Sequence, residues 1–336
     1  EASTPPRVMR SMAALGLSET AIIPAEVPDR LFVKAREFLE GVSTPEAFHE
    51  LDLPFQYPPH FIYDGILKDE GLGRVDPTLP GLDRYLAKTL HYLEVYDDIL
   101  NRHDVRGVVV SHPNFPRFST LAWRALQRDI PVYSTIHTNE HISVRRLEKP
   151  SDLCGAPVER PTKLFLGSLQ NDQRSELAEQ GRNYLDAVRR RAAGQFSIVD
   201  IYGGEILSRA DFAELTGTNP AKPNVVILTS CWSDGPNGPG RTYFTDYLDL
   251  LERTLEVINK TPECNWFLRP HPAEFHYGDK MRLNTLVSGR LPPHAQLWPE
   301  GISGSAVSGV ADCVVTAAGT AGIEYTALGK RVLVCR

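Results

Sequence analysis

The chain of 336 residues is 42% hydrophobic and 23% charged, as in ordinary globular proteins, and is long enough for two domains. Its 36 basic and 42 acidic residues give a net charge of −6 without a basic block, so nucleic acid is not an expected partner. No apolar run reaches the ~20 residues needed to span a bilayer, and no leader pattern opens the chain.

The cysteines bear on the compartment. There are five, an odd number, with no C-x-x-C pair, which favours small buried side chains in a reducing compartment. We therefore predict a cytoplasmic protein. Glu1 is an unusual start and predicts a missing N-terminal part, so attachment at the inner face of the cytoplasmic membrane stays open. The cysteines are Cys154, Cys231, Cys264, Cys313 and Cys335.

Proline-rich passages separate two helical stretches in the first hundred residues, at 29–39 and 82–101. In the second stretch, Leu82, Leu86 and Leu90 begin a series with steps of three or four residues. This spacing predicts an amphipathic helix that packs on a core.

The order of elements becomes clearer from Gly107 onward. A β-branched strand at 107–111, a helix at 118–129 and a strand at 130–136 form a βαβ unit, which predicts a parallel sheet covered by helices. A long charged helix is predicted at 175–193 and a short one at 211–215.

A polar, turn-forming run then predicts a connection at about 203–223. We divide the chain there into two Rossmann-like domains, 1–205, with helical additions, and 206–336.

Strand and helix patterns alternate most regularly in the last third of the chain. The predicted strands are 224–230, 265–269, 312–316 and 331–335, and the predicted helices are 244–258 and 321–328. This alternation predicts a second doubly wound domain, so the fold class is α/β. Because the chain ends on a strand, we also expect this domain to be cut at its C-terminus.

In open parallel sheets, ligands bind beyond the carboxyl ends of the strands. Polar and titratable residues follow predicted strands in both halves, as a cleft between two domains requires. The candidates are these residues together with two small residues of a turn, Ala318 and Gly319: Ser111, His112, Asn139, Glu140, His141, Asp234, Arg269, His271, Thr316, Ala318, Gly319, Thr320 and Glu324.

The turn from Gly319 to Gly322 connects a strand to a helix and can hold an anion. Glycine lets the backbone approach a ligand closely, and a helix N-terminus offers free N–H groups and partial positive charge. Thr320 either caps the helix or gives its hydroxyl to the same phosphate. Glu324 either binds a ribose hydroxyl pair or is a solvated surface carboxylate, and the turn itself is alternatively a tight connection without a ligand.

Two prolines fix the backbone around His271, directly after the strand that ends at Arg269. The ring can donate to a phosphate or shuttle a proton, or it can be a turn histidine bonded to the backbone. Asp234 lies in a glycine- and proline-rich loop. Its carboxylate can serve as base or nucleophile at an anomeric carbon, or it can close an Asx turn.

Other chemistries lack support in the sequence. His137 and His141 are four residues apart, but they follow a strand and have no third ligand nearby, so no metal site is expected. The chain also lacks the strand-following G-x-G-x-x-G of dinucleotide oxidoreductases, the P-loop of kinases and the G-x-S-x-G of α/β-hydrolases.

The order of four segments resembles bacterial capsule and surface-polysaccharide glycosyltransferases of the GT-B type, most of all the Kdo transferases of O-antigen, lipopolysaccharide and capsule synthesis. Polysialyltransferases and CDP-glycerol glycerophosphotransferases share the His-Pro and the later small-residue motif more distantly. The match is good over 225–336, loose over 107–141 and absent before residue 100. The segments are Ser233-Asp-Gly-Pro, Phe244-Thr-Asp-Tyr-Leu-Asp-Leu-Leu-Glu, Asn265-Trp-Phe-Leu-Arg-Pro-His-Pro and Thr316-Ala-Ala-Gly-Thr-Ala-Gly-Ile-Glu-Tyr-Thr-Ala-Leu-Gly-Lys.

The resemblance implies a GT-B fold with an acceptor-side N-terminal domain and a nucleotide-sugar donor held in the C-terminal domain. His271 and the 316–320 loop would hold the donor phosphate. Asp234 matches a proposed catalytic carboxylate of the Kdo transferases, and Glu140 is a looser match to an acceptor-side acid/base. This sequence has Ala317 and Ala318 at the positions where polysialyltransferase relatives have serines. Because those two hydroxyls are missing here, the departure puts a cytidine-monophosphate donor in doubt.

We therefore predict a glycosyltransferase that moves a sugar, with Kdo from CMP-Kdo as the specific hypothesis, onto a bacterial surface polysaccharide. A CDP-glycerol-type glycerophosphotransferase and a non-catalytic sugar-nucleotide-binding module of a larger polymerase are the alternatives. The expected partners are a nucleotide sugar and a glycan acceptor, and no metal cofactor is expected because fixed donors and a helix N-terminus would neutralise the phosphate.

Overall fold

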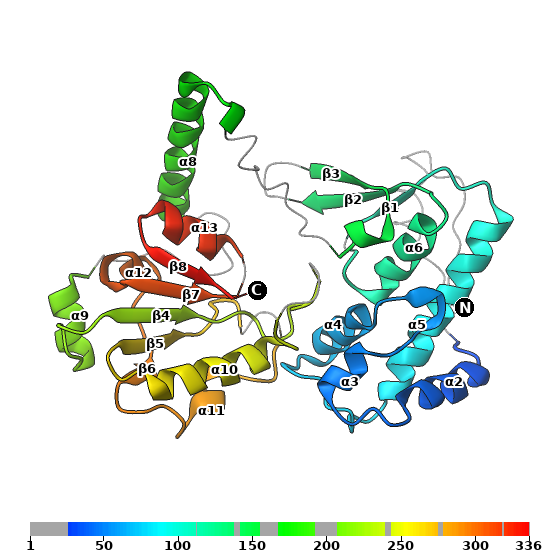
Figure 1. The fold of residues 1–336 in the computed structure, drawn as a ribbon, viewed down its shortest axis with the longest axis horizontal. Coiled ribbons are helices and arrows are strands. Elements are labelled where there is room, and N and C mark those ends of the chain that lie inside the picture. Colours follow the sequence, from blue (N-terminus) through cyan, green and yellow to red (C-terminus); the bar gives the residue numbers. More distant parts are fainter. Residues whose placement is uncertain are drawn as a thin grey trace.

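The computed structural model describes residues 26–111, 113–137, 142–154, 167–191, 207–238, 243–274, 278–317 and 319–335. Figure 1 shows two groups of strands, each accompanied by helices. One group lies in the N-terminal half of the chain and the other in the C-terminal half, so the two sheets have separate cores.

Helices form most of the N-terminal core. They bury apolar side chains such as Phe61, Ile66, Leu86 and Ala122 in one cluster, together with residues of the nearby strands. The predicted helices at 29–39 and 82–101 are confirmed. The elements are α2 (Asp29–Leu39), α3 (Pro45–His49), η1 (Pro54–Gln56), α4 (Pro59–Glu70), α5 (Leu82–Arg102), α6 (Pro116–Leu126) and η2 (Pro150–Asp152).

The N-terminal sheet has three strands in the described residues, in the order β1 (Val108–Val110), β2 (Val132–His137) and β3 (Ile142–Leu147). The pair β1–β2 is parallel with α6 between them in the chain, which confirms the predicted βαβ unit. The pair β2–β3 is antiparallel, and β3 was not predicted.

The C-terminal sheet is parallel throughout and has the strand order β6-β5-β4-β7-β8. In chain order this is 3-2-1-4-5, the order of doubly wound nucleotide-binding sheets. The strand β6 was not predicted. The strands are β4 (Asn224–Leu228), β5 (Asn265–Arg269), β6 (Ala295–Leu297), β7 (Cys313–Thr316) and β8 (Arg331–Val334).

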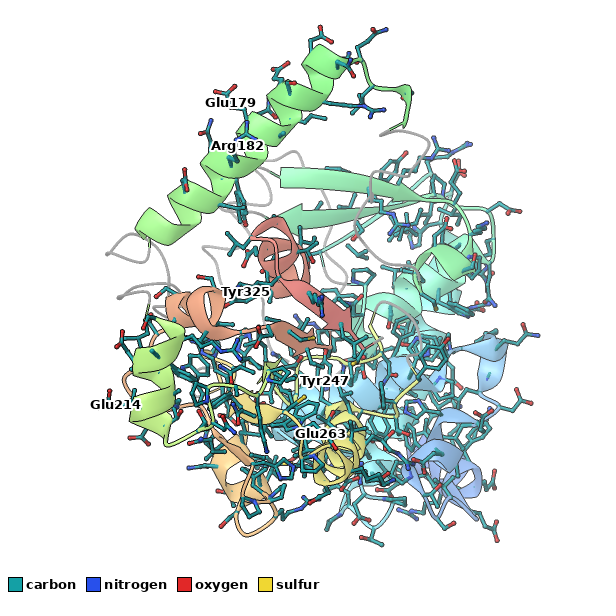
Figure 2. All side chains as sticks on the ribbon, turned by 60° about the vertical axis from the view of Figure 1, so that its left-hand side comes forward. Glu179, Arg182, Glu214, Tyr247, Glu263 and Tyr325 are labelled. Carbon is teal, nitrogen blue, oxygen red and sulfur yellow. The ribbon has the colours of Figure 1, made fainter. Side chains whose placement is uncertain are left out.

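Helices cover both faces of this sheet. On one face, α10 (Tyr247–Lys260) and α11 (Leu283–Val287) pack on alternate strand residues such as Val225 and Trp266. On the other, α9 (Arg209–Thr216), α12 (Ser305–Val310) and α13 (Thr320–Ala327) pack on the intervening residues. Figure 2 labels one side chain from each layer, Tyr247 on α10 and Tyr325 on α13.

The local sequence explains where α10 begins and how it is oriented. Asp246 accepts a hydrogen bond from the backbone N–H of Asp249 at 2.7 Å and caps the helix. Leu251, Leu255 and Ile258 then recur on one face and are buried. Burial of such side chains contributes about 1.5–3 kcal/mol each, so this face fixes the helix on the sheet.

The segments near the predicted domain boundary differ in how they pack. The long helix α8 (Asn171–Arg191) stands away from both sheets in Figure 1, and its side chains from 171 to 186 are exposed apart from half-buried Leu185. By contrast, α9 buries Phe212 between Phe267 and Trp298, with ring centroids 4.9 and 5.1 Å away. The proposed boundary at 205/206 lies outside the described residues.

The two halves contact each other through α4 and the loop after it. The hydroxyl of Tyr63 donates to Asp246 at 2.7 Å, and Arg74 forms ion pairs with Asp246 and Glu252. These contacts tie the N-terminal core to the beginning of α10.

The predicted α/β class is confirmed, with a βαβ unit in the N-terminal half and a doubly wound parallel sheet in the C-terminal half. The departure is the antiparallel β3, which adds an edge strand to the N-terminal sheet. Among the helices that the described residues form, none has both the length and the apolar character to cross a bilayer.

Candidate functional site

Three neighbouring strands bring two of the predicted phosphate ligands to one edge of the C-terminal sheet. Leu228, at the end of β4, pairs with Arg269 of β5 on one side and with Thr316 of β7 on the other. Since neighbouring strands lie ~4.8 Å apart, the backbones of Arg269 and Thr316 are roughly 10 Å apart. The winding of the chain reverses between β4 and β7, which is where open α/β sheets bind ligands.

A cavity of about 30 Å³ lies at this edge, between the ends of β4 and β7 and the first turns of α10. Thr229, Ser230 and Thr316 line it together with apolar side chains. The volume suits about one or two water molecules, so a nucleotide at this edge would lie mainly outside the cavity.

The ring of His271 is held in one orientation just beyond β5. Its Nδ1 accepts the backbone N–H of Ala273 at 3.1 Å and lies 3.1 Å from the Sγ of Cys231. Burial, and then the nearby positive charge of Arg269, lower the pKa of His271, so the ring is neutral at pH 7. Because Nδ1 accepts, the proton is on Nε2, and the Nε2–H group is the donor that remains for a ligand.

The turn interpretation of His271 therefore applies to one ring nitrogen and leaves the other for binding. Buried Cys231 keeps its thiol proton, because burial raises its pKa to about 12. Cys231 thus acts as a packing neighbour of the ring and not as a thiolate.

Asp234 lies in the loop after β4, and about half of its side chain is exposed. Partial burial raises the pKa of its carboxyl, and the ammonium group of Lys68, 3.6 Å away, opposes that shift. The backbone N–H of Asp234 donates to the carbonyl of Cys231 at 3.2 Å, which makes a tight turn. No Asx-turn bond from the Asp234 carboxylate is found in the described part of the chain.

Two buried carboxylates hold the loop that carries Asp234. Asp279 accepts hydrogen bonds from the backbone N–H groups of Trp232 and Ser233, at 2.9 and 3.2 Å, and from the Ser233 hydroxyl at 2.5 Å. Glu274 accepts the indole N–H of Trp232 at 2.8 Å. These bonds fix the backbone of the loop in which Asp234 lies, and Cys231 of the same loop contacts the His271 ring.

Two residues of α4 also reach this loop, and neither was predicted from the sequence. Asp64 accepts the backbone N–H of Asn237 at 2.9 Å and its side-chain amide at 3.1 Å, and Lys68 pairs with Asp234. The one signal in the sequence was an aspartate inside the largely apolar run 61–67, a run that the structure buries completely. The sequence alone did not indicate which part of the chain it would contact.

The start of α13 differs in two respects from the sequence-based interpretation. Gly319 is the N-cap, with φ of 101° and no side-chain capping bond, so Thr320 is the first helical residue and does not cap the helix. Thr320 is exposed, which keeps its hydroxyl available to a ligand. Glu324 is buried, so the alternative of a solvated surface carboxylate is wrong. Its proposed bond to a ribose stays a prediction.

The acceptor-side candidates are only partly described. Ser111 is half-buried directly after β1. The loop after Ser111, which contains Asn114, packs against the loop that carries Asp234. Gly238 of the second loop lies so close to Asn114 that an added Cβ would be 2.9 Å from the side-chain nitrogen of Asn114. The strand ends of the two halves therefore approach each other here. His112, Asn139, Glu140, His141 and Ala318 lie outside the described residues.

A metal site does not emerge from the described part of the chain, where no three His, Cys, Asp or Glu side chains come together as ligands. The expectation of metal-independent chemistry stays a prediction. The arrangement offers instead a neutral imidazole donor, the guanidinium of Arg269, a helix N-terminus and one half-exposed carboxylate.

No family model and no curated protein matches this chain. Among solved structures, it is similar to "Thermosulfurimonas dismutans KpsC, beta Kdo 2,4 transferase", with 14% identity, a TM-score of 0.37, and 69% of this chain and 80% of that one covered.

The chain is also similar to two UDP-N-acetylglucosamine 2-epimerases at 14% identity. The enzyme from Neisseria meningitidis, bound to UDP-GlcNAc, has a TM-score of 0.30, with 74% of this chain and 64% of that one covered. For the enzyme from Rickettsia bellii the TM-score is 0.27, and the coverage is 74% and 61%. The chain thus spans less than two thirds of either epimerase.

Proposed function

We propose that this chain is a glycosyltransferase that binds a nucleotide-sugar donor at the carboxyl edge of the C-terminal sheet and transfers the sugar to a glycan acceptor. The observation that carries the proposal is the position of Arg269 and Thr316 on the two strands that flank β4, at the point where the winding reverses. His271 and the N-terminus of α13 follow these same two strands.

The donor phosphate is bound electrostatically. The Nε2–H of His271 donates to a phosphate oxygen, and the free backbone N–H groups at the start of α13 favour the same negative charge. Negative charge develops on the phosphate as the bond to the sugar breaks and the nucleotide leaves. Hydrogen-bond donors that are fixed in this way also stabilise that charge.

Asp234 acts on the sugar at the anomeric carbon. It is the half-exposed carboxylate of a loop that is otherwise anchored by buried bonds, so it is both accessible and fixed in position. It serves as the nucleophile if the linkage is retained and as the base toward the acceptor hydroxyl if it is inverted.

The specific hypothesis is that the sugar is Kdo, delivered from CMP-Kdo to a growing bacterial surface polysaccharide. It depends on the resemblance of the segments around Asp234, His271 and Thr316. Because Ala317 and Ala318 stand where polysialyltransferase relatives carry serines, Thr320 is the hydroxyl we assign to the donor phosphate. Its exposure favours it over Thr316, which is 4% exposed.

A donor screen tests the proposal. Thermal unfolding is followed with CMP, UDP, GDP and CDP-glycerol, and a ligand at 100 times its Kd stabilises the native state by about 2.7 kcal/mol. We expect stabilisation by CMP that is lost in His271→Ala and kept in His103→Ala, a control at the end of α5. Stabilisation by CDP-glycerol together with glycerol phosphate transfer would favour the glycerophosphotransferase alternative.

Transfer itself is tested with Asp234→Asn. This variant should lose sugar transfer and keep the nucleotide-dependent stabilisation, because Asp234 acts on the sugar and not on the phosphate. Turnover at the wild-type rate would remove Asp234 from the mechanism. A wild-type protein that binds nucleotide but neither transfers nor hydrolyses the donor would be the non-catalytic module.

A further inference from the structure

One face of α4 is directed at the loop that carries Asp234. Asp64 and Lys68 are four residues apart, so they lie one above the other on the same side of the helix. Both contact the segment from 234 to 238, although α4 belongs to the N-terminal core and the segment follows β4 of the other half.

Asp64 is fully buried and binds the loop through two bonds. Its Oδ2 accepts the backbone N–H of Asn237 and its Oδ1 accepts the side-chain amide, which also donates to the carbonyl of Thr245. Gly235 fits closely against this carboxylate, since an added Cβ would lie 3.4 Å from Oδ2. Its φ of 59° is one that glycine adopts readily.

Lys68 faces the reactive carboxylate itself. Its ammonium nitrogen lies 3.6 Å from the Oδ1 of Asp234, and about a third of its side chain is exposed. Of the acidic groups near Asp234, Asp279 from the loop before α11 raises the pKa of Asp234. Asp64 from α4, whose own pKa burial raises to about 8, keeps its proton at neutral pH. Lys68 is therefore the cation that offsets both the burial of Asp234 and the nearby Asp279 carboxylate.

We propose that α4 completes the active site: Lys68 holds Asp234 as an anion by ion pairing, and Asp64 fixes the loop that carries it. This inference rests on the proposed function, because it assigns two positioning residues to the same reaction. It also makes the charge of Asp234 depend on contact between the two halves of the chain.

The charge of Asp234 can be measured without any substrate. In protein labelled with ¹³Cγ-aspartate, the resonance of Asp234 is identified by its loss in Asp234→Asn, and its titration is then followed by NMR. Lys68→Met should move the Asp234 titration to higher pH, because the carboxylate loses its cation. Lys68→Arg should restore it, and Lys88→Met, on the exposed side of α5, should leave it unchanged.

The kinetic effect separates positioning from a merely structural role. Lys68→Met should lower kcat by about tenfold at the acidic end of the pH profile and less at the alkaline end, where Asp234 ionises without help. Asp64→Asn should lower kcat while the nucleotide-dependent thermal stabilisation stays as in the wild type.

The outcomes distinguish this inference from the proposed function. If Lys68→Met leaves both the Asp234 titration and the pH profile unchanged, the inference is overturned even though transfer continues. An unchanged kcat in Asp64→Asn would remove Asp64 from the site. If no donor is turned over by the wild type but Lys68→Met still shifts the titration, the electrostatic coupling stands and the transferase proposal fails.

Discussion

The hydroxyl of Tyr63 is a single group that connects the two halves of the protein. It donates to the Oδ2 of Asp246 at 2.7 Å and accepts the backbone N–H of Val75 at 3.1 Å. Burial and the nearby Asp246 carboxylate raise the pKa of Tyr63, so the hydroxyl keeps its proton and acts as the donor. Tyr63→Phe removes this group and leaves the buried ring in place.

The cost can be worked out from these contacts. A hydrogen bond to a charged group contributes about 1.5–3 kcal/mol, and a buried N–H left without a partner costs about 1–3 kcal/mol. In Tyr63→Phe, Asp246 still accepts hydrogen bonds from Arg74 and from the backbone N–H of Asp249. The lost bond to Asp246 should therefore cost an amount near the lower end of the ~1.5–3 kcal/mol range. We expect a destabilisation of about 3 kcal/mol, which corresponds to a fall in Tm of roughly 6–12 °C for domains of this size.

Differential scanning calorimetry measures this effect, with Tyr57→Phe as the matched control. Tyr57 is also buried, but its hydroxyl bonds to Ser119, inside the N-terminal core, at 2.5 Å. The control should lose about 1 kcal/mol, because both partners are neutral. In a double-mutant cycle, the effects of Tyr63→Phe and Asp246→Asn on the free energy of unfolding should be coupled by about 1–2 kcal/mol. Additive effects, or a loss no larger than in the control, would refute this account of the interface.

Three further predictions concern the C-terminal half and its contact with α4. Burial raises the pKa of Asp64 to about 8, above the ~3.9 of an unfolded aspartate. The stability that Asp64 contributes is therefore full below about pH 4 and is lost as the pH rises to about 8. Chemical denaturation across this range should show a falling free energy of unfolding in the wild type, and Asp64→Asn should remove that fall. Gly319→Ala should lower the free energy of unfolding by about 1–2 kcal/mol, as measured by thermal unfolding, and should weaken nucleotide binding. The reason is the φ of 101° at Gly319, which strains any residue with a Cβ, and not a clash, because no atom lies within 4 Å of an added Cβ. Phe212→Ala should lower the free energy of unfolding by about 3–5 kcal/mol, since it empties the space between Phe267 and Trp298; a loss below 1 kcal/mol would mean that α9 is not part of this core.

Much of the C-terminal fold followed from local patterns. The β-branched runs that became β4 and β7, and the recurrence of Leu251, Leu255 and Ile258 along α10, each reflect the period of one element. The position of Arg269 and Thr316 at one sheet edge followed as well, because the carboxyl ends of parallel strands meet there.

The sequence by itself determined the elements with regular periods, their parallel arrangement and the residues at the strand ends. Only the tertiary structure revealed that β3 turns back antiparallel, that Glu324 is buried, and that Asp64 and Lys68 of α4 contact the Asp234 loop. The physical reason is the distance along the chain over which each feature is determined. Periodicity depends on neighbours within one helix or strand. The hydrogen bond between Asp64 and Asn237 joins residues 173 positions apart, and it forms only when two separately packed cores come together.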